Sequence, residues 1–378
     1  MCKIFGFSGD LNGECIKIIR GLILAEEGNN PHGTGLVLYD EKKGQFMIKK
    51  KGLRGLYFIA RGYGDFLNRN RDSKTHLIGH VRLKTSGPQT DRNAHPFGSV
   101  CRGRWHFLIH NGVLGGRMLK VAQKFSANTD KVEVDSELFL RCITAQLRKG
   151  VKITDAIKNA TYEISDIGDF AFALLNDEGI YLWRNSQRPL NVFFYGDNIF
   201  FASTKNMFEK ALEIAGVEPD QIEYSEVKPY HLYRIRFKDG KPVIKDTDEI
   251  PHRDTVSKKK KKSYSFYDEY GYYDLYGYGN GKNKKQKEQS PLFNPCWGNT
   301  GGLEDKCTTE DEIFNKAPYE LTNEELDRAI SILEQDYYTV SDSDVETKID
   351  IEACLQAYYD ERRNRQIFKG GGNEVEPF

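Results

Sequence analysis

Cys2 carries the most reactive chemistry in this sequence. Its side chain is small, so we expect the initiator Met1 to be removed, which leaves a thiol and a free α-amino group on one residue. An α-amino group titrates at about pH 7.7–8.0 in model peptides, so part of it is unprotonated at neutral pH and can accept the thiol proton. The same amine can later protonate a leaving group. Cys2 is therefore a candidate nucleophile that brings its own base, although a lone cysteine near a terminus could equally be an apolar strand residue.

Polar residues at the ends of predicted strands and at the start of a predicted helix could complete a site around Cys2. A strand that ends at Arg82 presents a guanidinium, which can hold a carboxylate by two parallel hydrogen bonds. A strand that ends in Asn111 and Gly112 offers a side-chain amide and an unshielded backbone N–H to an oxyanion. Asp135, at a helix start, could bind a substrate ammonium or cap the helix. Together these groups suit an α-amino acid with a reactive side-chain amide.

Six short segments, in their order along the chain, resemble the class II glutamine amidotransferase family, whose glutaminase domain belongs to the N-terminal-nucleophile (Ntn) hydrolases. They are Met-Cys at 1–2, a Gly-rich segment at 31–35, R-x-x-T-x-G at 82–87, N-A-H-P at 93–96, H-N-G at 110–112 and D-S-E at 135–137. Many family members have Trp and His where this chain has Leu83 and Ser86. That departure concerns the loop over the glutamine site and leaves the catalytic set intact.

The resemblance implies a role for each candidate site residue. These roles are nucleophile for Cys2, oxyanion hole for Asn111 and Gly112, α-carboxylate binding for Arg82, α-ammonium binding for Asp135, and support of the substrate site for Thr85 and His95. The implied reaction is attack of the thiolate on the glutamine carboxamide, loss of ammonia, and hydrolysis of the thioester to glutamate. No metal and no organic cofactor are expected.

The elements that must position these residues are predicted to be strands in sequential runs with helices between some of them. Strands are expected at 3–7, 35–39, 45–49, 76–82, 105–110, 170–175, 180–183, 192–195, 199–202 and 230–237, and helices at 15–26, 136–148, 154–164 and 205–215. Strands that follow one another without a helix, as over 170–202, favour antiparallel sheets over a doubly wound parallel sheet. The fold class expected is α+β, and the resemblance implies the four-layer αββα sandwich of the Ntn hydrolases.

Composition excludes several other classes of protein. The chain has 378 residues, and its 55 basic and 55 acidic residues give a net charge of zero, so it exerts no general attraction on nucleic acid. No run approaches the roughly 18 apolar residues of a membrane span, and we expect a soluble, cytoplasmic protein. The seven cysteines are scattered, which matches neither a disulfide framework nor a zinc site.

Three regions are expected along the chain. Residues 1–250 form the glutaminase domain, 251–305 a disordered linker rich in Lys, Tyr and Gly, and 306–378 a helical extension. In the extension, Thr322 and Glu325 form a capping box before an amphipathic helix, and a second amphipathic run covers 345–359. Two helices bury little by themselves, so this end is expected to dock on the main domain or on a partner.

Three functions remain open at this stage. Residues 255–378 lack the length and pattern of a synthase domain, so the first is a glutaminase that acts on L-glutamine and delivers ammonia to a separate synthase protein. The second is a stand-alone hydrolase of γ-glutamyl amides or peptides, which would use the same residues. The third is a non-catalytic protein that binds nucleic acid or a partner through the Lys/Tyr-rich residues 258–290.

Overall fold

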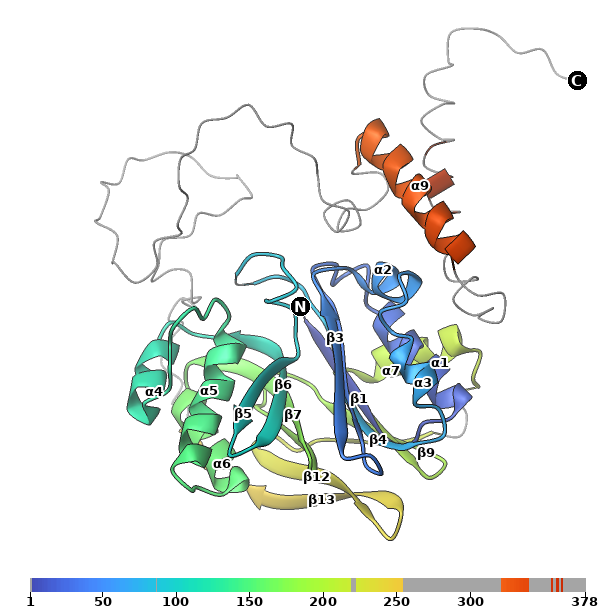
Figure 1. The fold of residues 1–378 in the computed structure, drawn as a ribbon. Helices are drawn as coiled ribbons and strands as arrows, with labels where there is room; N and C mark the ends of the chain where they lie inside the picture. The colour runs from blue at the N-terminus through green and yellow to red at the C-terminus, as the bar shows by residue number, and fades with distance from the viewer. Residues whose placement is uncertain are drawn as a thin grey trace, which may run out of the picture.

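Two antiparallel sheets form the centre of residues 2–253 in the computed structural model of the chain (Figure 1). The structure describes residues 2–85, 87–218, 222–253 and 321–339, together with the helical residues 355, 358, 359 and 362. The predicted linker therefore lies outside the described residues from 254 onward, as does most of the predicted extension. Within the described part, no helix is long and apolar enough to cross a membrane.

The first sheet has seven strands in the order β11-β9-β10-β1-β4-β2-β3. Their bounds are β1 Lys3–Asp10, β2 Thr34–Asp40, β3 Gln45–Lys51, β4 Lys74–Val81, β9 Asn191–Tyr195, β10 Asn198–Ala202 and β11 Glu223–Glu226. β1 lies near the middle and pairs with β10 and β4, with Phe5 opposite Ala202 and Lys3 opposite Val81. This pairing on both edges fixes the start of β1, and with it Cys2.

The second sheet has six strands in the order β13-β12-β8-β7-β6-β5. Their bounds are β5 Phe97–Cys101, β6 Arg104–Leu114, β7 Gly168–Asn176, β8 Gly179–Arg184, β12 His231–Lys238 and β13 Lys241–Glu249. β6 is the longest and lies between β5 and β7, with Asn111 opposite Ala171 and Gly112 opposite Phe170. The pairing with β5 covers only residues 104–108, so at the oxyanion-hole candidates β6 is paired with β7.

Helices cover the outer face of each sheet, so the domain has four layers. α1 (Gly13–Leu24), α2 (Gly55–Ala60), α3 (Phe66–Arg69) and α7 (Lys205–Ala215) pack on the first sheet, and α4 (Met118–Phe125), α5 (Asp135–Arg148) and α6 (Ile153–Ile164) pack on the second. Alternation along β1 shows the layering, because Phe5 and Phe7 face the helices while Ile4 enters the core between the sheets. The structure confirms the α+β, four-layer αββα prediction.

All ten predicted strands and the four helices predicted in residues 1–250 are present, and the described residues of this range hold six further elements that were not predicted. β11 and β13 escape a hydrophobicity-based prediction because β11 is exposed along its whole length and β13 is mostly polar. β5 has the short sequence FGSVC, with Gly and Ser inside it. Backbone pairing to a better-defined neighbour holds each of these strands. The helices α2 and α3 are six and four residues long, too short for a periodic pattern, and α4 has only eight residues.

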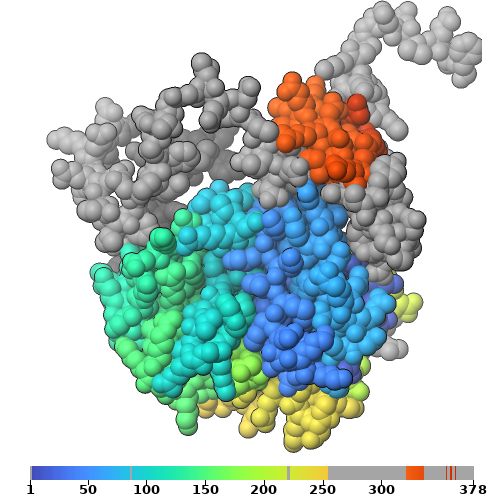
Figure 2. Space-filling view, in the orientation of Figure 1, coloured from blue at the N-terminus to red at the C-terminus, as the bar shows by residue number. Residues whose placement is uncertain are grey.

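The helix α9 (Asn323–Thr339) packs on the domain next to α2 (Figure 1, Figure 2). The predicted capping box is confirmed: the backbone N–H of Thr322 donates to Glu325 Oε2 at 2.8 Å, and that of Glu325 to Thr322 Oγ1 at 3.1 Å. The shared cluster joins Leu53, Tyr57 and Ala60 to Leu321, Leu326, Ala329, Ile330, Leu333, Leu355 and Tyr358. The extension thus docks on its own domain. Of the second amphipathic run, only residues 355, 358 and 359 are among those described.

Candidate active site

Cys2 lies at the beginning of β1 with its side chain 7% exposed. Its thiol donates a hydrogen bond to the carbonyl oxygen of Leu83, with Sγ and O 3.1 Å apart. Burial raises the pKa of the Cys2 thiol above its ordinary value, while the hydrogen bond to Leu83 and the positive charge of Arg82 act in the opposite direction. The buried thiol is therefore protonated at neutral pH, and a nucleophilic role requires a base close to it.

Arg82 directly follows β4, and its backbone is fixed by the Gly-rich segment. Its N–H donates to the carbonyl oxygen of Gly33 at 2.7 Å, and its own carbonyl accepts from the N–H of His32 at 2.9 Å. The side chain is 2% exposed, and Nη1 donates to the carbonyl oxygen of Pro88 at 3.2 Å. Its charge acts on both the Cys2 thiol and the Asp135 carboxyl, so the guanidinium lies within electrostatic reach of both.

Asn111 is connected to the start of β1 through Ser203. The Nδ2 atom of Asn111 donates to Ser203 Oγ at 3.2 Å, and the same oxygen accepts from the N–H of Ile4 at 2.8 Å. The Asn111 amide is thereby tied to the residue two places after Cys2. Its Oδ1 atom is buried and has no hydrogen-bond partner among the described residues, so the side chain retains polar capacity in this part of the core.

Gly112 has a backbone conformation and surroundings that admit only glycine. Its φ is +150°, and a Cβ atom there would lie 1.9 Å from the carbonyl oxygen of Asp169. The absence of a side chain is what lets β6 and β7 approach at this point. It also leaves the N–H of Gly112 unshielded by a side chain of its own residue, as an oxyanion donor requires.

Asp135 is the first residue of α5 and is 5% exposed. Its Oδ2 atom accepts from the N–H of Leu114 at 2.7 Å, and its Oδ1 atom accepts from the N–H of Ser136 at 2.8 Å and from Ser136 Oγ at 3.2 Å. Burial raises the pKa of Asp135, and these hydrogen bonds and the Arg82 charge oppose that rise. The N-cap of α5 is Val134, so Asp135 does not occupy the capping position that the sequence left open for it.

The two supporting candidates lie in very different surroundings. His95 is 4% exposed, and its ring stacks on His80 with centroids 4.0 Å apart. Neither ring nitrogen has a hydrogen-bond partner in the part of the chain that the structure describes. Burial lowers the pKa of His95 well below its ordinary value, so the ring is neutral. Thr85 is exposed in the loop after Arg82. The structure therefore gathers Cys2, Arg82 and Asp135, links Asn111 to them through β1, and leaves Thr85 at the surface.

Three polar residues around the site were not singled out from the sequence. Ser203 bridges Asn111 and Ile4, Ser136 donates to Asp135, and Lys50 donates from Nζ to the carbonyl oxygens of Arg92 and Ala94 at 2.9 and 2.8 Å. Ser136 belongs to the D-S-E segment at 135–137, and this is its only sequence signal, whereas none of the six segments contains or adjoins Ser203. Lys50 has no such signal, because it is the middle one of three consecutive lysines in β3 and nothing in the sequence distinguishes it from the other two.

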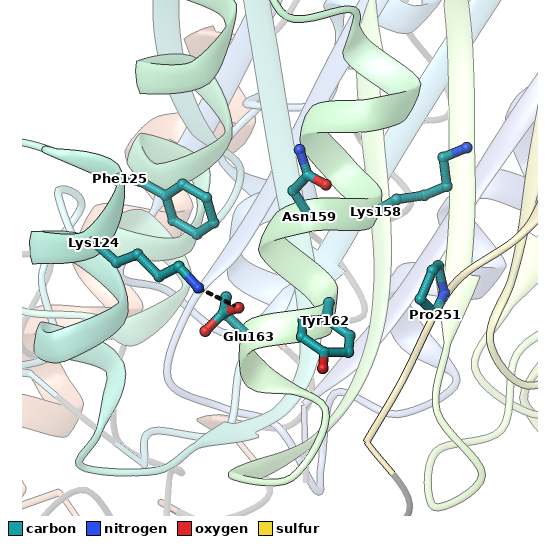
Figure 3. Close-up of a pocket in the computed structure, with 7 residues that line it drawn as sticks. All are labelled: Lys124, Phe125, Lys158, Asn159, Tyr162, Glu163 and Pro251. Carbon is teal, nitrogen blue, oxygen red and sulfur yellow. Dashed lines mark hydrogen bonds and ion pairs between the residues drawn. The ribbon is translucent and has the colours of Figure 1, made fainter.

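A separate groove of about 410 Å³ opens between α4 and α6, beside the segment that follows β13 (Figure 3). It is lined by Lys124, Phe125, Lys158, Asn159, Tyr162, Glu163 and Pro251. The ammonium of Lys124 forms an ion pair with Glu163 at 2.7 Å across it. No candidate site residue lines this groove. Among the described residues, no group of three or more His, Cys, Asp or Glu side chains is arranged to hold a metal ion.

Comparison with known proteins gives relatives that share part of this chain. Glutamine–fructose-6-phosphate aminotransferase (isomerizing) of Streptococcus agalactiae is 26% identical over 226 residues, which are 59% of this chain and 35% of that enzyme. The enzyme of the same name from Lactococcus lactis is 30% identical over 231 residues, again 59% of this chain and 35% of the relative. The chain thus matches about a third of the length of these enzymes.

The fold also has a counterpart among solved structures. Glutamine phosphoribosylpyrophosphate amidotransferase of B. subtilis, in complex with ADP and GMP, superposes with a TM-score of 0.51 at 21% identity, covering 65% of this chain and 49% of that one. The family model described as class II glutamine amidotransferases matches residues 1–196, which hold every candidate site residue. This chain therefore belongs to the class II glutamine amidotransferases and has the Ntn-hydrolase fold.

Proposed function

We propose that this chain hydrolyses the side-chain amide of L-glutamine, with Cys2 as nucleophile, and releases ammonia for a separate acceptor protein. The observation that carries this proposal is the buried Cys2 thiol within electrostatic reach of one cation, Arg82, and one anion, Asp135. These two charges complement the α-carboxylate and the α-ammonium of an amino acid. A substrate held by both would place its side chain toward the remaining polar group of the site, the Asn111 amide.

The proposed reaction has two steps. The α-amine of Cys2 takes the thiol proton, and the thiolate attacks the carboxamide carbon while Asn111 and the N–H of Gly112 stabilise the oxyanion. The C–N bond then breaks, and the departing nitrogen takes the proton from the amine as ammonia. Water hydrolyses the γ-glutamyl thioester, which yields glutamate and restores the thiol. Burial raises the pKa of the Cys2 thiol, so the adjacent amine is what makes the thiolate accessible.

The first test combines intact mass with ammonia release from L-glutamine. The proposal requires a protein without Met1 that releases ammonia and glutamate, and a Cys2→Ser variant that does not. Cys101→Ser is the matched control, because Cys101 is also buried but lies in β5, and it should keep its activity. Equal activity in the wild type and Cys2→Ser would exclude Cys2 as nucleophile.

The second test decides the substrate class. The γ-glutamyl half is common to L-glutamine and to γ-glutamyl peptides, so the same residues serve both, and kcat/KM for glutamine against a γ-glutamyl dipeptide measures the preference. A higher value for glutamine supports ammonia production. A higher value for the dipeptide indicates a hydrolase that releases an amine and needs no ammonia acceptor.

The acceptor is proposed to be a separate protein, in place of the synthase domain for which residues 255–378 show no sequence pattern. Copurification from the native source, followed by coupled assays of ammonia transfer with the recovered protein, tests this. Glutamine-dependent product formation by the pair, with none by either protein alone, is the expected result. Glutaminase activity that no copurifying protein consumes would contradict it.

A further inference from the structure

A buried chain of hydrogen bonds connects His110 to the carboxylate of Asp135. The Nδ1 atom of His110, on β6, lies 2.9 Å from the Oγ atom of Ser136, on α5, and that oxygen lies 3.2 Å from Asp135 Oδ1. The side chains of His110 and Ser136 are each only 2% exposed. The reaction proposed above uses Asp135 but gives neither of these neighbours a role. Their position suggests that they act on the substrate through Asp135.

Electrostatics determines which atom is the donor in each hydrogen bond between His110, Ser136 and Asp135. Burial lowers the pKa of His110 to about 3, so its ring is neutral and carries one proton. The Ser136 hydroxyl donates to the carboxylate, because hydrogen bonds to an ionised acceptor are roughly twice as strong as neutral ones. Ser136 Oγ then accepts from His110, which places the ring proton on Nδ1. The alternative proton on Nε2 would face the Asp169 carbonyl at 3.4 Å, beyond normal hydrogen-bond length.

Packing holds the His110 ring in this orientation. The ring stacks on Phe172 with centroids 4.3 Å apart, and its backbone carbonyl accepts from His80 Nε2 at 3.1 Å. A Cβ atom placed on Gly112 would lie 2.7 Å from His110 Nε2, so the ring lies directly behind the proposed oxyanion donor. Gly112 therefore packs against the Nε2 edge of the His110 ring, while the Nδ1 edge faces Ser136.

The carboxylate keeps capacity for a ligand after these bonds are made. Asp135 Oδ1 accepts two hydrogen bonds, whereas Oδ2 accepts one, from Leu114, among the residues that the structure describes. Each carboxylate oxygen has two lone pairs, so Oδ2 can accept one more donor. Donors to the ionised carboxylate also oppose the effect of burial, which favours its neutral form.

We propose that His110 is a positioning residue for the α-ammonium of the substrate: acting through Ser136, it keeps Asp135 ionised and oriented toward that ammonium. This inference rests on the proposed binding of an α-amino acid beside Cys2. It assigns a specific function to the histidine of the H-N-G segment and to the serine of the D-S-E segment. Both act on binding of the amino group and not on the chemistry at the carboxamide.

The test measures the ligand's amino group directly. In a full-length Cys2→Ala protein, which cannot turn substrate over, calorimetry gives the dissociation constants of L-glutamine and of glutaramic acid, the same molecule without the α-amino group. Ser136→Ala should weaken L-glutamine binding roughly tenfold, as loss of a charge-assisted hydrogen bond predicts, and change glutaramic acid binding by less than about twofold. Ser136→Thr keeps the hydroxyl and should retain the preference for L-glutamine.

His110 is tested by a pair of substitutions in the same protein. His110→Asn places an amide N–H near the position of Nδ1 and should keep most of the preference for L-glutamine, whereas His110→Leu should lose it as Ser136→Ala does. Equal weakening of both ligands by Ser136→Ala would indicate a structural role and overturn the inference. An unchanged preference in His110→Leu would overturn it as well.

Failure of the proposed function has a different signature. If the wild type releases no ammonia from glutamine, yet the Cys2→Ala protein prefers L-glutamine to glutaramic acid and loses that preference with Ser136→Ala, the positioning role stands and the hydrolysis does not. If L-glutamine does not bind at all, both proposals fall. Loss of turnover in Cys2→Ser together with the expected calorimetry supports both.

Discussion

The candidate site has two walls that are built very differently. One consists of Asn111 and Gly112 on β6 with Asp135 on α5, all set in paired strand or helix and held by buried hydrogen bonds. The other is the loop of residues 82–96, in which Arg82 is buried but Thr85 is exposed. The difference indicates that the first wall is formed before substrate binds. The second is partly buried and partly exposed, and hydrogen bonds to several other segments hold it in place.

Several of the contacts that hold the loop come from the end of β3 and the residue after it. Asp91 Oδ1 accepts from the N–H of Gly52 at 2.8 Å, Gln89 donates to the carbonyl of Gly52 at 2.9 Å, and Lys50 donates to two loop carbonyls. Leu53 follows and belongs to the cluster that α9 covers. Changes at the oxyanion candidates Asn111 and Gly112 should therefore act on kcat. Changes around the loop should act on KM, as should changes that disturb Asp135.

The largest effect is expected from Asn111→Ala. Loss of one oxyanion donor lowers kcat by roughly 10²–10³-fold in comparable sites. No residue that the structure describes in the loop is placed to donate a hydrogen bond in its stead. Steady-state ammonia release measures kcat and KM, and circular dichroism checks that the fold is retained. A kcat within threefold of the wild type would show that Asn111 is not part of the oxyanion hole.

The next effect tests whether α9 supports the loop wall. Leu333 is fully buried against the α2 region, and Leu333→Ala should cost ~2 kcal/mol of α9 docking, at the low end for a buried leucine in a small cluster. Hydrogen exchange of α9 amides measures this loss. Leu53 contacts the α9 cluster, and its neighbour Gly52 is hydrogen-bonded to the loop. Weaker docking of α9 should therefore loosen the loop and raise KM for glutamine up to about threefold, with kcat unchanged.

Glu324→Ala is the control for that experiment, because Glu324 lies in the first turn of α9 and is exposed. This variant should change neither the hydrogen exchange of the α9 amides nor KM for glutamine. A fall in kcat on Leu333→Ala, with KM constant, would contradict the division between the two walls.

Lys50→Met tests the loop contacts directly. It removes the donors to the carbonyls of Arg92 and Ala94 at similar side-chain length, so KM should rise by a few fold with little change in kcat. Lys49→Met, at an exposed position of the same strand, is the control and should change neither. A kcat loss larger than the KM rise would show that the loop contributes to the chemical step.

The same lysine gives a pH dependence. Burial lowers the pKa of Lys50 from 10.5 to about 8. Between these values the unfolded chain holds the proton and the folded chain does not, so stability conferred by this group rises with pH across that window. The difference in unfolding free energy between wild type and Lys50→Met should therefore grow in favour of the wild type from pH 7.5 to pH 9.5. Urea unfolding at the two pH values measures it, and a shrinking difference would be the wrong sign.

The first wall could be located from the sequence, whereas its supports could not. Asn111, Gly112 and Asp135 flank the predicted strand 105–110 and the predicted helix 136–148. The strand is longer than predicted, because β6 continues to Leu114 and carries Asn111 and Gly112 within it. Ser203 contacts Asn111 across 92 positions of sequence, and His110 reaches Ser136 across 26, so these contacts exist only in the folded chain. The packing of α9 on α2 has the same origin, since the amphipathic pattern of α9 is visible in the sequence but its partner α2 is too short to be recognised there.

The smallest effect is expected at Thr85. This residue tests whether the exposed part of the second wall contributes to the site at all. The family resemblance gave Thr85 a supporting role, yet the structure places it exposed in the loop, where a side chain contributes only if the loop closes over a substrate. If the loop keeps its present position, Thr85→Ala should change kcat/KM for glutamine by less than twofold. Thr34→Ala is the contrasting variant, because Thr34 is buried and its hydroxyl donates to the carbonyl of Leu53 at 2.9 Å. A loss of tenfold or more on Thr85→Ala, confined to KM, would mean that the loop moves inward on binding and that the second wall is completed only by the substrate.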